Sequence, residues 1–109
     1  MTEDVLQRLS ALIEARRTES ASKSYTRELL DAGPERCAKK LGEEATETII
    51  AALAQDGRSL TREAADLVYH LLVLLECKRV PLSDVLAELE ARMGTSGLVE
   101  KAARDKKAQ

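Results

Sequence analysis

The sequence predicts an all-α fold, a helical bundle of about five helices. Both prolines and most of the five glycines fall between periodic stretches, where residues that interrupt helices are expected. Apolar residues recur at three- and four-residue intervals along most of the chain, as they do on the buried face of an amphipathic helix. No stretch of five or more residues combines a clean apolar–polar alternation with β-branched residues, so we predict no strands.

The expected helices are the following: residues 3–17, 24–30, 34–55, 59 or 61 to 78, and 83–93. In the first, Val5, Leu9 and Ile13 fall on one stripe at helical spacing, and Thr2 can cap the start. The second is a short helix or turn that follows a polar, serine-rich stretch. Gly33 ends it.

The later helices have their own start and stop signals. Pro34 suits the first turn of the third helix, where its missing N–H is not needed. We expect Asp56-Gly57 to end that helix with a left-handed glycine cap. Ser59 or Thr61 would cap the fourth helix, and Pro81 separates it from the fifth. The apolar residues that we expect to face inward from the fifth helix are Val85, Leu86, Leu89 and Met93.

Length and composition exclude several classes of protein. The 109 residues fit one domain, 1–109, with a charged tail from about residue 98. Net charge is −2 and aromatic residues are only 2%, so neither a basic nucleic-acid footprint nor a base-stacking platform is present. Apolar runs such as residues 71–75 are far shorter than the roughly 20 residues that span a membrane. No apolar leader opens the chain, so we expect no signal peptide.

The two cysteines, Cys37 and Cys77, form no CxxC pair. With a single histidine in the chain, they cannot complete a zinc site. We interpret them as reduced, buried thiols of a cytosolic protein.

The fourth helix predicts association with a second copy. Residues 67–75 are apolar on nearly every side, and a helix of that kind is buried on all sides. Five helices in 109 residues cannot surround it within one chain. We therefore expect a homodimer or a larger oligomer, the dimer being the simplest.

Two acidic pairs form a candidate metal site. Glu44 and Glu47 are three residues apart on the third helix and share a face, with Glu43 further round. Glu63 and Asp66 repeat this spacing on the fourth helix. If the two helices pack antiparallel across the short connection between them, the pairs can converge. Converging carboxylates need a cation, and hard oxygen ligands suit Mg²⁺, with Mn²⁺ as a substitute.

The spacing alone leaves two interpretations open. Glutamates at i, i+3 are common on solvated helix surfaces, and acids near a helix N-terminus are favoured by the helix dipole without any metal. The alternative is a magnesium site built for attack on a phosphate.

Other polar residues are candidates for substrate contact. Lys39 and Lys40 either support neighbouring acids on the helix surface or contact phosphates. We interpret His70, the only histidine, as a satisfied core residue rather than a ligand. A hydroxyl-rich segment is either a helix cap or a substrate loop: Ser24-Tyr25-Thr26.

These motifs resemble a known family. The acidic pattern is similar to the ExxE…ExxD signature of the all-α nucleoside triphosphate pyrophosphohydrolases (the MazG-like superfamily). More specific sequence motifs, over roughly residues 5–105, resemble those of the phosphoribosyl-ATP pyrophosphohydrolases. These motifs are Ser24-Tyr25-Thr26, Ala38-Lys39-Lys40-Leu41-Gly42-Glu43-Glu44-Ala45 and Glu63-Ala64-Ala65-Asp66-Leu67-Val68-Tyr69-His70.

The resemblance implies Mg²⁺-dependent hydrolysis of phosphoribosyl-ATP to phosphoribosyl-AMP and pyrophosphate, the second step of histidine biosynthesis. It implies that Glu44, Glu47, Glu63 and Asp66 bind the metal, and that Glu43 adds a ligand or acts as base toward the attacking water. It also implies an intertwined homodimer in the cytoplasm. In some organisms a cyclohydrolase that acts next is fused to this enzyme. Here we expect it to be a separate protein.

By the same resemblance, the substrate-binding residues are Lys39, Lys40, Ser24, Tyr25 and Thr26. Two alternatives remain open at this point. One is a house-cleaning hydrolase of non-standard nucleotides with the same fold and acids. The other is a non-catalytic helical dimerisation module.

Overall fold

The computed structural model describes residues 4–20, 24–94 and Arg104, and within them it is all-helical with no strand. This confirms the predicted fold class. Thr2, the expected first cap, and the tail from residue 98 lie outside the described residues, apart from Arg104. The elements are α1 (Asp4–Ala15), a 3₁₀ turn η1 (Arg16–Thr18), α2 (Tyr25–Ala32), α3 (Pro34–Ala54), α4 (Gly57–Cys77) and α5 (Leu82–Met93).

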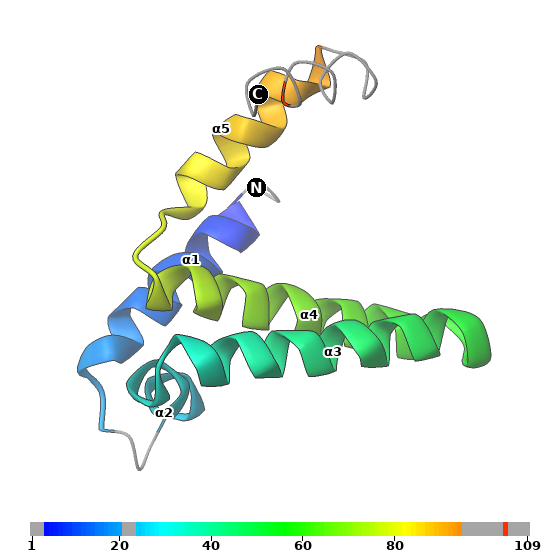
Figure 1. The fold of residues 1–109 in the computed structure, drawn as a ribbon, viewed down its shortest axis with the longest axis horizontal. Helices are drawn as coiled ribbons and strands as arrows, with labels where there is room; N and C mark the ends of the chain where they lie inside the picture. Colours follow the sequence, from blue (N-terminus) through cyan, green and yellow to red (C-terminus); the bar gives the residue numbers. More distant parts are fainter. Residues whose placement is uncertain (1–3, 21–23, 95–103, 105–109) are drawn as a thin grey trace.

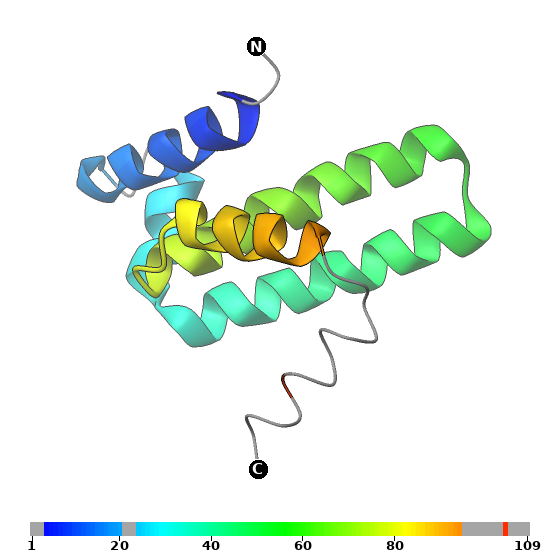
Figure 2. The same ribbon diagram turned by 90° about the horizontal axis from the view of Figure 1, so that it is seen from above.

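A long antiparallel hairpin of α3 and α4 is the centre of the molecule (Figures 1 and 2), and each of its helices has 21 residues. Gly33, with φ of 97°, turns the chain from α2 into α3, and Pro34 occupies the first turn as predicted. A left-handed φ of this kind is strained for residues with a Cβ, which explains the glycine. The hairpin places the middle of α3 beside the N-terminal half of α4.

The connection between α3 and α4 differs from our prediction. Gly57 is not a left-handed cap: it is the first residue of α4, and Gln55 ends α3 in an extended conformation. Asp56, not Ser59 or Thr61, caps α4, because its carboxylate accepts a hydrogen bond from the Ser59 N–H at 2.9 Å. An aspartate in this position satisfies an otherwise free helix donor, so α4 starts at once and the turn stays tight.

The hydrophobic core lies at the end of the hairpin that carries α1 and α2. Its buried residues are Ile13, Leu29, Leu30, Cys37, Leu72 and Val73. Arg17 of η1 links this turn to α4, because its guanidinium donates hydrogen bonds to both the carboxylate and the backbone carbonyl of Glu76. The core therefore joins the N-terminal helices to the base of the hairpin and leaves the far half of the hairpin without cover from them (Figure 1).

Both cysteines are free thiols, as predicted, but Cys77 is only partly buried. Cys37 is fully buried and donates to the Leu29 carbonyl oxygen at 3.2 Å. Burial, with the neighbouring Cys77 adding to it, raises the pKa of Cys37 to about 11. The thiol therefore stays protonated and unreactive at neutral pH.

Several apolar side chains lie on the surface of the single chain. Leu53 is 84% exposed, whereas Ala51, on the opposite side of α3, is 1% exposed. Our prediction for α5 is wrong at Leu89 and Met93, which are exposed because α5 points away from the hairpin (Figure 1). The radius of gyration, 16.2 Å, exceeds the roughly 13 Å of a compact domain of this length. Among the described residues, no helix combines the length and apolar character that a membrane crossing requires.

Candidate metal centre

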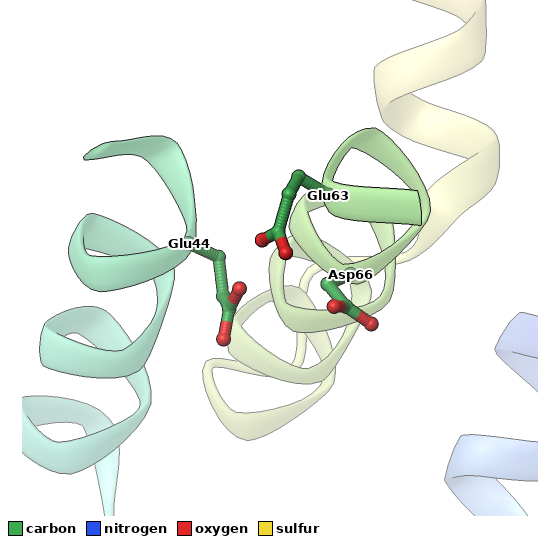
Figure 3. A group of neighbouring side chains, drawn as sticks. All are labelled: Glu44, Glu63 and Asp66. Atoms are coloured by element: carbon green, nitrogen blue, oxygen red, sulfur yellow. The ribbon is translucent and has the colours of Figure 1, made fainter. Parts of the chain in front are cut away.

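Three carboxylates converge between α3 and α4. Glu44 comes from the middle of α3, and Glu63 and Asp66 come from the N-terminal half of α4. One oxygen from each side chain lies within 4.8 Å of the others, and Figure 3 shows the three groups gathered at the gap between the helices. The i, i+3 spacing places both α4 acids on one face, and the tight turn at Asp56 brings that face to α3.

Thr48 holds the two helices in register beside this group. Its hydroxyl donates to the Glu44 carbonyl oxygen at 2.7 Å and reaches the Glu63 carbonyl oxygen at 3.2 Å in a shared hydrogen bond. The contact thus joins the backbones of two acidic residues on different helices. Sequence reasoning assigned Thr48 no function, because a threonine within a helix pattern gives no signal that its hydroxyl crosses to another helix.

Electrostatic repulsion shapes the three-carboxylate group. Partial burial raises the pKa of Glu63, and the nearby Asp66, Glu44 and Glu47 raise it further. In the described part of the chain, the ion pairs with lysine or arginine use other carboxylates. Arg62 offsets this repulsion only in part. Three oxygen donors without an ion pair among the described residues suit a hard divalent cation such as Mg²⁺.

The structure separates the other two acids from this group. Glu47 is exposed and lies outside the three-carboxylate group, although it is near enough to Glu63 to raise its pKa. Glu43 forms an ion pair with Lys40 at 3.1 Å. That hydrogen bond lowers the pKa of the Glu43 carboxyl and raises the pKa of the Lys40 ammonium.

The predicted substrate residues have different environments. Lys39 is exposed, and Lys40 is half-buried. Ser24 is buried and caps α2, because its hydroxyl accepts from the Arg27 N–H at 3.1 Å. Thr26 is buried as well, and its hydroxyl bonds to that of Tyr69 at 2.5 Å.

Tyr25 alone of the hydroxyl-rich segment is exposed, and its hydroxyl bonds to His70. Lys40, Arg36 and Glu44 all lie close enough to influence the pKa of Tyr25, which burial raises. Arg36 was missed by sequence reasoning. Its spacing of four residues before Lys40, on the same face of α3, was the available signal.

Comparison with known proteins identifies the family. The family model described as phosphoribosyl-ATP pyrophosphohydrolase matches residues 6–93. A protein of Jannaschia sp. named phosphoribosyl-ATP pyrophosphatase is 57% identical over 91% of this chain and 97% of its own length. Proteins of the same name from Cereibacter sphaeroides and Agrobacterium fabrum are 54% and 57% identical, over 92% and 91% of this chain and 97% and 92% of their own lengths.

The resemblance drawn from the sequence motifs is thereby confirmed. The chain is an enzyme that hydrolyses a phosphoric anhydride bond, and it belongs to the phosphoribosyl-ATP pyrophosphohydrolase family.

Proposed function

We propose that this protein hydrolyses phosphoribosyl-ATP to phosphoribosyl-AMP and pyrophosphate, as a step of histidine biosynthesis, and that it requires Mg²⁺. One observation carries the proposal: Glu44, Glu63 and Asp66 converge across the hairpin in a chain that belongs to this family. A triphosphate substrate reaches enzymes with Mg²⁺ on its phosphates, and such ions are held by a few carboxylates together with substrate oxygens. The three-carboxylate group supplies that donor set.

We assign different roles in the reaction to the residues around this group. Glu44, Glu63 and Asp66 would hold Mg²⁺, or Mn²⁺ in its place, and the ion would neutralise charge on the phosphates and polarise them toward attack. Glu47 is exposed and near enough to Glu63 to raise its pKa, and we assign to it the orientation of the attacking water and the uptake of its proton. Glu43 forms an ion pair with Lys40, and its role in this proposal is to hold that lysine in place.

Lys39 and Lys40 provide positive charge next to the acids. They are followed on α3 by Glu44, one turn later, so phosphates bound by the ion would extend over them. The ion pair with Glu43 raises the pKa of Lys40, which keeps this ammonium charged at any pH at which the enzyme works.

A substrate panel tests the reaction. Purified protein with Mg²⁺ is mixed with phosphoribosyl-ATP and, in parallel, with ATP, dUTP and dCTP, and pyrophosphate release is measured. We expect rapid release from phosphoribosyl-ATP alone. Release only from the simple nucleotides would assign a house-cleaning activity instead. Release from none of them would favour a helical dimerisation module.

Thermal denaturation tests the metal site without any substrate. Mg²⁺ at about ten times its Kd adds about 1.4 kcal/mol to stability, which corresponds to a rise in Tm of about 6–10 °C for a domain of this size. We expect that rise for the wild type. The protein concentration is held constant, because oligomers have concentration-dependent Tm values.

Glu63→Gln should lose the rise in Tm that Mg²⁺ causes in the wild type. Folding raises the pKa of the Glu63 carboxyl. The protein therefore loses stability as pH rises through that raised pKa, because the folded state disfavours the charged carboxylate. Near pH 7 the neutral glutamine therefore removes repulsion, and we expect a higher metal-free Tm than in the wild type, with no further rise in Mg²⁺. Glu90→Gln, on the exposed surface of α5, is the matched control and should keep the wild-type response. An equal Mg²⁺ response in Glu63→Gln would contradict the site.

The active form is a homodimer in this proposal. The support is an apolar ridge on α3, formed by Ile49, Ile50 and Leu53, on the side that faces away from α4. On α4, Val68 and Leu71 are exposed as well. Apolar surface of this extent on helices marks a protein interface. The free thiols suit the reducing conditions of the cytoplasm, where we place the enzyme.

A further inference from the structure

His70 bridges the candidate metal centre and α2. Its side chain is 6% exposed, and it is the only histidine of the chain. Nδ1 lies 2.8 Å from the backbone carbonyl oxygen of Asp66, one turn earlier on α4. Nε2 lies 3.2 Å from the hydroxyl oxygen of Tyr25 on α2. One imidazole thus connects the backbone of an acidic residue in the three-carboxylate group to a tyrosine of another helix.

The partners of His70 determine the direction of both hydrogen bonds. A backbone carbonyl oxygen only accepts, so Nδ1 carries the hydrogen and donates to Asp66. A neutral imidazole then has no hydrogen on Nε2, so the Tyr25 hydroxyl donates to it. The Tyr25 oxygen keeps its lone pairs and can only accept from a further group.

Tyr25 is linked through the imidazole of His70 to the backbone of Asp66 in the three-carboxylate group. Its ring is stacked on Tyr69 (6.4 Å between centroids) and meets His70 edge-on (6.0 Å). Lys40 and Glu44 are near enough to influence its pKa. The residue nevertheless remains 48% exposed, which leaves part of Tyr25 open to contact with a bound molecule.

We propose that His70 is a positioning residue for the reaction, and this rests on the function proposed above. It orients Tyr25 so that the hydroxyl oxygen accepts a hydrogen bond from the nucleoside part of the substrate. Phosphate oxygens carry no hydrogen to donate, whereas sugar hydroxyls and the adenine amino group do. Tyr25 would therefore recognise the nucleoside, and Lys39 and Lys40 the phosphates.

Two substitutions at His70 separate positioning from packing. In His70→Asn the amide nitrogen can keep the bond that Nδ1 makes, but the acceptor for Tyr25 is lost. In His70→Gln the longer amide places an oxygen near the position of Nε2 and retains that acceptor. Tyr25→Phe removes only the hydroxyl, from a side chain that is half exposed, and should not disturb folding.

Steady-state kinetics with phosphoribosyl-ATP gives the decisive comparison. Loss of one such hydrogen bond costs about tenfold. Because the nucleoside contact exists in both the ground state and the transition state, we expect KM to rise by that factor and kcat to stay within about twofold. Tyr25→Phe, His70→Asn and the double variant should show the same rise, and His70→Gln a clearly smaller one. Equal losses in His70→Asn and His70→Gln, with an additive effect of Tyr25→Phe, would reduce His70 to a packing residue.

Nitrogen NMR of the wild type tests the same proposal without substrate. Since the chain has one histidine, its imidazole gives a single set of ring ¹⁵N signals. We expect the tautomer with the hydrogen on Nδ1, and in Tyr25→Phe a shift confined to Nε2. A hydrogen on Nε2 would overturn the proposal. If the wild type releases no pyrophosphate from any nucleotide while the Nδ1 tautomer is observed, the proposed function has failed and not the hydrogen-bond assignment.

Discussion

Asp66→Asn is expected to lower the rate of pyrophosphate release from phosphoribosyl-ATP by about a thousandfold. The substitution keeps the size of the side chain and removes the charge of one of three converging carboxylates. A metal ligand that stabilises charge in the transition state contributes several kcal/mol, and an amide is a poor replacement for an anionic ligand. The measurement is kcat/KM for the wild type and the variant at saturating Mg²⁺.

The control for this experiment is Asp84→Asn, the same change at an exposed position in the first turn of α5. It should retain wild-type kinetics. Asp66→Asn preserves the backbone carbonyl that accepts from His70, so circular dichroism should show an intact fold. Wild-type turnover in Asp66→Asn would remove Asp66 from the metal centre and leave the family assignment in place.

Leu53→Glu is expected to convert the proposed dimer into monomers. Leu53 is 84% exposed in the single chain and belongs to the apolar ridge of α3. A carboxylate buried in an apolar interface without a partner costs several kcal/mol, and a twofold interface contains each substitution twice. We therefore expect the Kd of the dimer to rise about a thousandfold or more, which light scattering coupled to gel filtration would detect as a halved mass.

Gln55→Glu provides the matched control for the dimer. It adds the same charge two residues further along, just beyond the end of α3 and at an exposed position, and it should leave the mass unchanged. If Leu53→Glu and the wild type have the same mass, the ridge is not the dimer interface. A monomeric wild type would contradict the dimer altogether.

The main elements of the candidate site could be predicted from the sequence because helices impose a fixed angular spacing. An advance of 100° per residue places Glu63 and Asp66 on one face, and it places Glu44 on the side of α3 that faces α4. A connection of two residues between the helices allows only an antiparallel arrangement. Spacing and loop length together therefore bring these three acids together.

The functions of the neighbouring polar residues could not be predicted in the same way. Glu43 and Glu44 are adjacent in sequence, but one pairs with Lys40 and the other joins the carboxylates. Ser24, Tyr25 and Thr26 are consecutive hydroxyl residues, yet only Tyr25 remains exposed. The docking of α2 against α4 decides which of them is buried, and no local pattern encodes that contact.

By itself, the sequence determined the all-α class, the order of the helices and the acidic pairs, since helix periodicity and interrupting residues act over a few positions. Asp56 caps α4 through a local bond to Ser59, a role that our prediction gives to other residues. Tertiary packing brings about two further contacts: Thr48 joins the backbones of Glu44 and Glu63, and His70 connects Asp66 to Tyr25. The latter two contacts join residues far apart in the chain, and hydrogen bonds form only where packing brings a donor and an acceptor within about 3 Å.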